Sequence, residues 1–296
     1  MTANPIFRGA ATALVTPMHA DGAVDYESFG RLIDWQIDEG IDALVIAGTT
    51  GEGSTLSDSE HRELLAYATE RINGRVPCIV GTGSNDIAYA VDLTKFACSI
   101  GADAMLVVTP YYNKATQKGL ISSFNAIADA SDKPIIAYNV PSRTGVGIEP
   151  STYLELSKHP NITAIKEANG NISKIVETAA LVGDRLDIYS GNDDQIVPIL
   201  AMGGSGVISV LSNIMPAQTS RLCHTFFEGN VTESARAQCE YTELIKALFC
   251  EVNPIPVKAA VAAMGFGGNN LRLPLTPMES ANEAKLLSLM AKQGLI

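Results

Sequence analysis

The chain has 296 residues, enough for one large α/β domain or two ordinary ones. Its 32 acidic and 21 basic residues give a formal charge of −11, which argues against non-specific binding to nucleic acids or to anionic membranes. Every apolar stretch is far shorter than the roughly 18 residues of a membrane span, and Met1–Arg8 lacks the basic and apolar regions of a secretory signal. The five cysteines are widely scattered, so we expect reduced thiols, a cytoplasmic location and no metal site.

Short apolar runs recur along the chain and predict a series of buried strands. They are Gly9–Thr16, Ala43–Ala47, Val76–Gly81, Ala102–Thr109, Pro134–Val140, Ile162–Ala168, Leu186–Ser190 and Gly206–Val210. Segments with helical spacing lie between them, including Tyr26–Glu39, Ser57–Ile72, Ile87–Ile100 and Ile172–Val182. Asp25, and Ser57 with Glu60, are typical helix-capping residues. Strands that alternate with helices predict βαβ crossovers and a parallel sheet.

Eight strand–helix units predict an α/β fold of the TIM-barrel type, (β/α)8. In the alternative, an open doubly wound sheet, a Gly-x-Gly-x-x-Gly pattern would be expected after the first strand, which ends instead in Val15-Thr16-Pro17. After about Ser212 only helical patterns remain, at Ala217–Phe227, Ser234–Phe249, Pro256–Met264 and Met278–Gln293. We expect residues 1–228 to form the catalytic barrel and residues 229–296 to form a C-terminal helical region.

Lys166 is the most informative single residue. It shares one face of the strand Ile162–Ala168 with Ala164 and Ala168, because side chains alternate along a strand. The alanines leave room around the ammonium but little water, and desolvation lowers the pKa of a lysine. A neutral amine can attack a carbonyl carbon and form a Schiff base. Taken alone, the segment favours a lysine that reaches solvent or pairs with a carboxylate, and only the rest of the chain favours the nucleophile.

The carboxyl ends of barrel strands form the reactive face, and the polar residues expected there are numerous. They lie in Gly48–Gly53, Thr109–Asn113, Tyr138–Gly145, Gly191–Asp194 and Ile208–Ser209. The loop Gly48–Gly53 fits a carboxylate held by threonine hydroxyls and backbone N–H groups, or a plain tight turn; it lacks the lysine that ends a nucleotide-binding P-loop. Arg143 is suited to receive an anion or to form a surface salt bridge.

Lys258 is the other lysine in an apolar segment, and we interpret it as structural because it lies outside the barrel strands. The remaining groups indicate a carbonyl substrate with a carboxylate, an amine nucleophile, and phenol or hydroxyl groups that carry protons. Those are the parts of a Schiff-base aldolase, in which the iminium withdraws electrons from the neighbouring carbon.

The chain resembles the dihydrodipicolinate synthase family, in the superfamily of pyruvate-dependent class I aldolases and N-acetylneuraminate lyases, over essentially its full length. The matching motifs are Gly48-Thr49-Thr50-Gly51-Glu52, Pro110-Tyr111-Tyr112-Asn113, Tyr138-Asn139-Val140-Pro141-Ser142-Arg143-Thr144-Gly145 and Ile165-Lys166-Glu167. The first, third and fourth are shared in outline with the sugar-acid lyases. The ending Arg143-Thr144-Gly145 discriminates between them, because the synthase family uses that arginine for the carboxylate of aspartate semialdehyde.

The resemblance implies a lyase that condenses pyruvate with L-aspartate 4-semialdehyde to give 4-hydroxy-tetrahydrodipicolinate, on the route to diaminopimelate and lysine, without a cofactor. The implied catalytic residues are Lys166 as Schiff-base lysine and Tyr138, Thr49 and Tyr112 as proton relay. The implied substrate-binding residues are Thr50, Arg143, Gly191 and Ile208. Tyr112 would reach into the neighbouring subunit's site across a tight dimer, and two dimers would form a homotetramer. The alternatives are a lyase for N-acetylneuraminate or another 2-keto-3-deoxy sugar acid, and a non-catalytic barrel that binds keto acids.

The resemblance also marks a candidate site for feedback-inhibiting lysine at the dimer interface. The residues at those positions are Ser54, Asp58, His61, Asn85, Tyr89 and Tyr111. Asp58 stands where inhibited relatives have a histidine, and Tyr89 stands where they have a glutamate that contacts the effector's ammonium. Losing that carboxylate removes a charge-assisted hydrogen bond, so we expect L-lysine to inhibit weakly or not at all.

Overall fold

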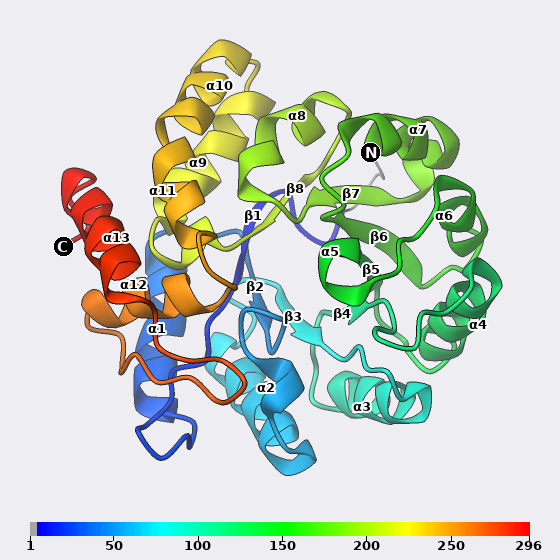
Figure 1. Cartoon of the computed structure of the whole chain (residues 1–296). Coiled ribbons are helices and arrows are strands. Elements are labelled where there is room, and N and C mark those ends of the chain that lie inside the picture. Colours follow the sequence, from blue (N-terminus) through cyan, green and yellow to red (C-terminus); the bar gives the residue numbers. More distant parts are fainter. Residues whose placement is uncertain (1–4) are drawn as a thin grey trace.

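Eight parallel strands close into a barrel in the computed structural model, which describes residues 5–296 (Figure 1). The strands are β1 (Gly9–Ala13), β2 (Ala43–Ile46), β3 (Cys78–Gly81), β4 (Ala104–Val108), β5 (Ile135–Asn139), β6 (Ile162–Glu167), β7 (Asp187–Ser190) and β8 (Gly206–Ser209). Each strand pairs with the next along the chain, and β8 pairs back to β1, with Gly206 opposite Gly9 and Ser209 opposite Thr12. The (β/α)8 barrel predicted from the sequence is confirmed.

The predicted strands lie in the right places but several extend too far, and β1 shows why. The strand ends at Ala13, although its apolar run continues to Val15. The backbone N–H of Val15 donates to the side-chain oxygen of Asn213 at 3.0 Å instead of to a neighbouring strand. Val15 is nevertheless fully buried. An apolar run therefore predicts which residues are buried, and burial can extend beyond the residues that form the hydrogen bonds of the strand.

Helices cover the outside of the barrel (Figure 1). They are α1 (Tyr26–Asp38), α2 (Asp58–Ile72), α3 (Ile87–Ser99), α4 (Gln117–Ala128), α6 (Pro150–Leu156), α7 (Ile172–Val182), α8 (Ile196–Ala201) and α9 (Pro216–Phe227), with the one-turn helix α5 (Pro141–Thr144) after β5. Short 3₁₀ turns occupy Gly53–Thr55, Gly183–Arg185, Asp193–Gln195 and Leu211–Asn213. The Asp25 side chain accepts from Ser28 N, and Ser57 forms a full capping box with Glu60, so both predicted helix starts are confirmed.

Four further helices follow the barrel: α10 (Val231–Glu240), α11 (Thr242–Leu248), α12 (Ile255–Ala263) and α13 (Ser280–Lys292). The prediction of one continuous helix over Ser234–Phe249 was wrong, because the chain breaks at Tyr241. The Thr242 hydroxyl donates to the Gln238 carbonyl at 3.1 Å and so competes for a helical acceptor. Helix α10 packs against α9, the last helix of the barrel, and α13 packs against α11 and α12. The domain boundary expected at residue 228 stays a prediction.

The apolar side chains form two layers, one between the strands and the helices and one inside the barrel. Phe7 and Tyr189 lie in the inner layer, stacked with ring centres 4.2 Å apart, and Tyr189 donates to the Phe7 carbonyl at 2.8 Å. Phe7 lies just before β1, so this stack fills the amino end of the barrel. The carboxyl end is the face toward the reader in Figure 1, where the loops after the strands meet.

Within residues 5–296, no helix is both long enough and apolar enough to cross a membrane. All five cysteines are free thiols. The expectation that Met1–Arg8 lacks a secretory signal falls partly on residues 1–4, which lie outside the described residues.

Candidate active site

Lys166 on β6 lies inside the barrel with only 6% of its surface exposed. Its Nζ atom is 4.3 Å from the centre of the Tyr138 ring, which comes from the paired position on β5. Burial lowers the pKa of Lys166 to about 7. The positive charge of Arg143 also lowers this pKa, and the negative charge of Asp193 raises it. A large share of the amine is therefore neutral near pH 7, and the neutral form is the one that attacks a carbonyl carbon.

Tyr138 is held as a neutral phenol beside this amine. Burial raises the pKa of Tyr138 to about 12, although the charge of Arg143 and a hydrogen bond with the Thr49 side chain both lower it. Tyr138 and Lys166 line the same cavity, so a protonated hydroxyl on Tyr138 can exchange a proton with a ligand bound there. The structure thus brings together Lys166, Tyr138 and Thr49, whose catalytic roles stay predictions.

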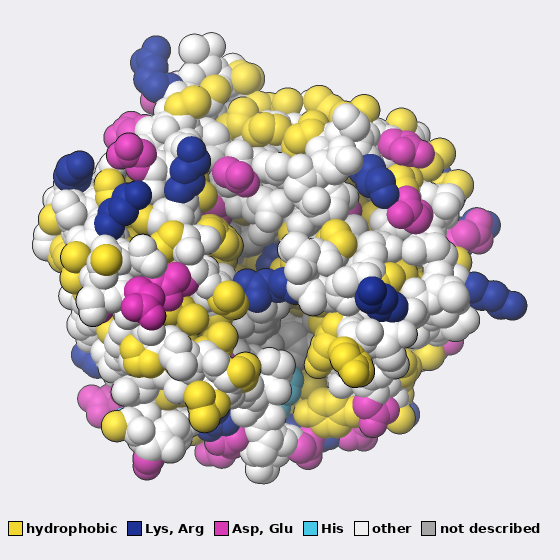
Figure 2. All heavy atoms as spheres, in the orientation of Figure 1, with side chains coloured by type: hydrophobic (Ala, Val, Ile, Leu, Met, Phe, Trp, Pro, Cys, Tyr) yellow, Lys and Arg dark blue, Asp and Glu magenta, His cyan; other side chains and the backbone are white. Residues whose placement is uncertain are grey.

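The Lys166 side chain faces a cavity of about 160 Å³ at the carboxyl end of the barrel. Its walls include Thr49, Thr50, Tyr138, Arg143, Lys166 and Gly191. Figure 2 shows a hollow near the centre of this face, with lysine or arginine side chains at its edge. In a chain with a net charge of −11, this local positive charge favours an anionic ligand.

Gly191 leaves the space that Lys166 occupies. A Cβ atom at Gly191 would lie 2.7 Å from the Ala168 Cβ and 3.2 Å from the Lys166 Cε, so a larger residue would displace the lysine. Ile208 is fully buried inside the barrel, two residues before Val210, which lines the cavity. The roles predicted for Gly191 and Ile208 in lining the substrate pocket stay predictions.

Asp193 is a residue of this site to which the sequence analysis assigned no role. It is 2% exposed, and its Oδ2 accepts from Val210 N at 3.0 Å and Leu211 N at 2.9 Å. Burial raises the pKa of Asp193, while these bonds and the nearby Lys166 charge lower it. Its position after β7, at the carboxyl end of a barrel strand, was the available signal. Asp193 supplies the negative charge that Lys166 meets when it is protonated.

Asn253, between α11 and α12, is the second residue that sequence analysis missed. Its Nδ2 donates to the Thr50 Oγ1 at 3.0 Å, and its carbonyl accepts from the Arg143 Nη2 at 3.1 Å. Thr50 thereby keeps its own hydroxyl proton for a ligand, and the Arg143 guanidinium is directed while it retains other N–H donors. Arg143 itself lies on the one-turn helix α5, where the sequence predicted a turn. No local pattern around Asn253 marks it as a site residue.

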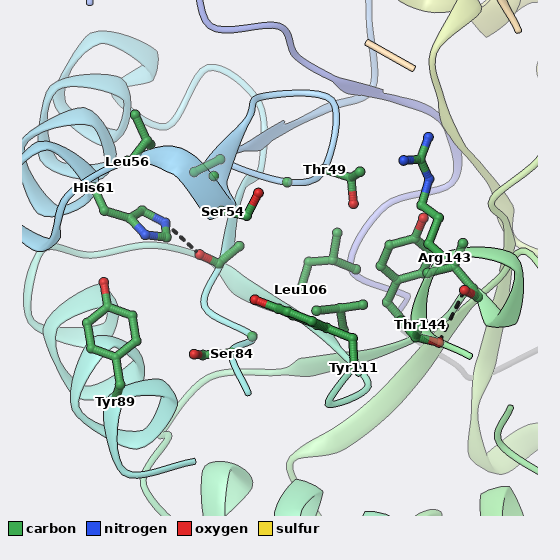
Figure 3. Close-up of a pocket in the computed structure, with 18 of the residues that line it drawn as sticks. Thr49, Ser54, Leu56, His61, Ser84, Tyr89, Leu106, Tyr111, Arg143 and Thr144 are labelled. Carbon is green, nitrogen blue, oxygen red and sulfur yellow. Dashed lines mark hydrogen bonds between the residues drawn. The ribbon is translucent and has the colours of Figure 1, made fainter. Parts of the chain in front are cut away.

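A larger cavity of about 450 Å³ adjoins the first (Figure 3). Both are lined by Thr49, Tyr138 and Arg143, so they form one continuous cleft. Figure 3 shows Thr49, Arg143 and Thr144 at one end of the larger cavity and His61, Tyr89 and Ser54 toward the other. The cleft therefore offers room for a second molecule beside one bound at Lys166.

Five of the six candidate effector residues line this cavity: Ser54, Asp58, His61, Tyr89 and Tyr111. In Figure 3, His61 and Tyr89 lie at the end away from Arg143, and Tyr111 lies nearer the middle. Asn85 is not among the residues that line the cavity, and its Oδ1 accepts from Tyr111 N at 2.6 Å. A His61 ring nitrogen lies 3.0 Å from the Gly81 carbonyl, and burial lowers the pKa of His61. The Asp58 carboxylate already accepts from the Arg62 Nε at 2.9 Å. The structure therefore brings the predicted set together, with Asp58 paired to a guanidinium.

Tyr112 does not join the other predicted catalytic residues. Its side chain is 90% exposed, and its backbone has φ of +68°, in the left-handed region that non-glycine residues rarely adopt. The residue lines neither of the two cavities.

The sequence model of the dihydrodipicolinate synthetase family matches residues 6–293. The chain belongs to this family. The 4-hydroxy-tetrahydrodipicolinate synthase of Alkaliphilus oremlandii is 52% identical over 291 residues, which cover 98% of this chain and 100% of the relative. The crystal structure of dihydrodipicolinate synthase from Aquifex aeolicus has a TM-score of 0.96 at 42% identity and covers 98% of this chain and 99% of that chain. The dihydrodipicolinate synthase from Cyanidioschyzon merolae, solved with lysine bound, has a TM-score of 0.96 at 38% identity, with 99% of this chain and 100% of that chain covered.

Membership in the dihydrodipicolinate synthetase family confirms the resemblance drawn from the four motifs. All four motifs supply walls of the cleft, through Thr49, Tyr111, Tyr138, Arg143 and Lys166 among others. The family fold places them at the ends of different strands, so residues far apart in the sequence share one cavity.

Proposed function

We propose that this enzyme condenses pyruvate with L-aspartate 4-semialdehyde to give 4-hydroxy-tetrahydrodipicolinate, a step toward diaminopimelate and lysine. The names of its relatives support this function. The observation that carries it is the buried, partly neutral amine of Lys166, which lies 4.3 Å from the Tyr138 ring in a cavity that Arg143 also lines.

The first half of the reaction uses pyruvate alone. The Lys166 Nζ attacks C2 of pyruvate, the carbonyl oxygen takes up protons and leaves as water, and an iminium forms. Thr50 and the neighbouring loop amides hold the carboxylate, and Tyr138 with Thr49 moves the protons. Loss of a proton from the pyruvate methyl group then gives an enamine, because the iminium accepts the electron pair.

The second half joins the two substrates. The enamine carbon attacks the aldehyde carbon of aspartate semialdehyde, whose oxygen becomes a hydroxyl group. Arg143 holds the carboxylate of this substrate by charge-assisted hydrogen bonds. The substrate amino group then attacks the iminium carbon, closes the ring and releases Lys166 as a free amine. One water leaves per product, and no external oxidant or reductant is needed.

Borohydride trapping tests the nucleophile directly. Incubation with pyruvate and borohydride should leave a stable adduct on the peptide that carries Lys166, and Lys166→Ala should abolish it. Lys258 is the internal control, because it is also buried but is paired with Glu52. A label on Lys258, or none, would refute the mechanism.

The substrate is tested by assays with aspartate semialdehyde and N-acetylneuraminate run side by side on one preparation. A sugar-acid lyase needs a hydroxyl-rich pocket, whereas Arg143 favours a second carboxylate. Activity on the sugar acid alone would overturn the proposed substrate. Tight pyruvate binding with no turnover would instead support a non-catalytic keto-acid-binding barrel.

We further infer that the enzyme acts in the cytoplasm as a homotetramer built from two tight dimers. The 90% exposed Tyr112 side chain supports this assembly, because it is suited to complete a neighbour's proton relay and lines neither cavity of its own chain. Sedimentation of the purified protein measures the assembly, and a stable, fully active monomer would contradict it.

Mixed subunits test the reach of Tyr112. Neither Lys166→Ala nor Tyr112→Phe subunits alone should be fully active. In a hybrid dimer, the Tyr112→Phe subunit keeps Lys166 and would receive an intact Tyr112 from its partner, so activity should return on mixing. No recovery, despite hybrids seen by mass spectrometry, would place Tyr112 in the site of its own chain or outside the mechanism.

We infer that the far end of the larger cavity is an effector cleft poorly suited to lysine. A lysine ammonium there would meet Tyr89 in place of a carboxylate, and Asp58 is already engaged by Arg62.

A further inference from the structure

The loop between β2 and α2 carries Thr49 and Thr50 in a conformation that needs outside support. Glu52 has φ of +54° and Ala47 has φ of +53°, both in the left-handed region that side chains other than glycine rarely adopt. A Cβ atom at Gly53 would lie 2.2 Å from the Ala47 carbonyl oxygen, so the turn is also closely packed on itself. Such a backbone persists only where the surroundings hold it.

A buried ion pair fixes this loop at Glu52. The Lys258 Nζ, from α12, lies 2.5 Å from the Glu52 Oε1, and each side chain is 2% exposed. The other carboxylate oxygen of Glu52 accepts from Arg272 N at 3.1 Å. Burial lowers the pKa of Lys258, and the Glu52 carboxylate raises it again. The proposed mechanism gives neither member of the pair a role.

The pair acts close to the two threonines. Glu52 N donates to the Thr49 carbonyl at 3.1 Å, so the residue that Lys258 holds is directly bonded to the turn containing Thr49. Asn253, just before α12, donates to the Thr50 hydroxyl at 3.0 Å. One C-terminal segment therefore contacts the loop twice, once at the ion pair and once at a threonine that lines the smaller cavity.

Stability alone is a weak reason for this pair. Removing two charges from water costs about as much as their attraction returns, and apolar replacements of similar volume are often neutral or stabilising. What this pair supplies is a fixed position for Glu52, because one carboxylate oxygen accepts from Lys258 and the other from Arg272 N.

We propose that the Lys258–Glu52 ion pair is a positioning device that holds the Thr49-Thr50 loop ready for the carboxylate of pyruvate, an inference that rests on the proposed function. Lys258 and Glu52 are positioning residues, since they act through Thr49 and Thr50 and lie outside the walls of both cavities. The C-terminal helices thereby take part in binding the first substrate.

The test uses the full-length double variant Glu52→Gln/Lys258→Met, which removes both charges and leaves no buried ion unpaired. We expect the KM for pyruvate to rise by roughly tenfold to a hundredfold, because an ångström-scale misplacement of a binding group has effects of this size. The KM for aspartate semialdehyde should change by less than about twofold. The matched control is Glu149→Gln/Lys174→Met, which removes a half-exposed ion pair elsewhere and should change neither constant.

If the pair serves folding alone, the double variant should have a lower midpoint of thermal unfolding than the parent and the parent's KM for pyruvate. That result, in a folded double variant, would overturn the proposal. Borohydride trapping of the parent keeps the two proposals distinguishable, since a parent that forms no adduct refutes the function rather than the positioning.

Hydrogen exchange of the parent decides the question if the double variant does not fold. Without substrate, the amides of residues 49–55 should exchange about as slowly as those of the barrel strands, because the ion pair already orders the loop. Fast exchange that becomes slow only when pyruvate binds would show that the substrate, and not the pair, orders the loop. That outcome would also overturn the proposal.

Discussion

The two buried lysines should respond in opposite directions to the same substitution. Lys166 is buried and feels the charge of Asp193 without an ion-pair contact to it, whereas Lys258 is in direct contact with Glu52. Lys166→Met keeps the length and volume of the side chain and removes its charge. We expect Lys166→Met to stabilise the folded protein and Lys258→Met to destabilise it.

The magnitude for Lys166 follows from its pKa, which burial lowers from 10.5 to about 7. Between these values the unfolded chain binds more protons than the folded one, so the free energy of unfolding of the parent rises with pH. The penalty for burying this lysine is about 4 kcal/mol at pH 7 and about 2 kcal/mol at pH 9. Lys166→Met should raise the free energy of unfolding by up to these amounts. The gain is reduced by the favourable interaction that the buried Asp193 carboxylate loses with the lysine cation.

Lys258→Met should lower the free energy of unfolding by about 3–5 kcal/mol, because it leaves the Glu52 carboxylate buried without its partner. The assay is urea unfolding at fixed protein concentration, followed by the fluorescence of Trp35, the only tryptophan. The advantage of Lys166→Met should shrink by about 2 kcal/mol from pH 7 to pH 9. A destabilised Lys166→Met, or an advantage independent of pH, would refute the assignment of Lys166 as a desolvated amine.

The remaining predictions concern catalysis and regulation. Tyr138→Phe removes one hydroxyl and keeps the ring, so kcat should fall by about 10²–10³ with little effect on folding, and an unchanged kcat would remove Tyr138 from the mechanism. The rate of pyruvate trapping at limiting pyruvate should rise with pH up to about 7 and then level off, because the neutral Lys166 amine is the nucleophile. A rate that still rises tenfold per pH unit between pH 8 and 10 would indicate an ordinary lysine. L-lysine should not half-inhibit the initial rate below about 1 mM, because losing a carboxylate partner costs ~1.5–3 kcal/mol of binding; stronger inhibition would mean that Asp58 leaves Arg62 to contact the ligand.

The fold and the centre of the site could be predicted from the sequence because each depends on local patterns. Strand Ile162–Ala168 was recognisable from its apolar run, and the alternation of side chains placed Lys166 on one face with Ala164 and Ala168. The structure shows that this is the inner face. The polar residues at the strand ends were then collected on one face by the topology of the barrel.

The parts that sequence reasoning missed depend on contacts between distant segments. Asn253 bonds to Thr50 across about two hundred positions, and nothing in its neighbours signals that contact. The break at Tyr241 has a different cause, because the bond from the Thr242 hydroxyl to the Gln238 carbonyl is local, while the helical period of the sequence continues on both sides of it. Asp193 was in view as a strand-end residue, but only its burial next to Lys166 shows that its charge acts on the nucleophile.

The Phe7–Tyr189 stack at the amino end of the barrel has a consequence for the order of events. Because two stacked rings with centres 4.2 Å apart fill that end, substrates reach Lys166 through the cleft at the carboxyl end. In the proposed reaction, pyruvate binds at Lys166 before the second substrate occupies the larger cavity. The cyclic product then leaves through the same cleft by which the next pyruvate enters. A second substrate that enters too early blocks the lysine from the first, so excess aspartate semialdehyde should compete with pyruvate at the entrance.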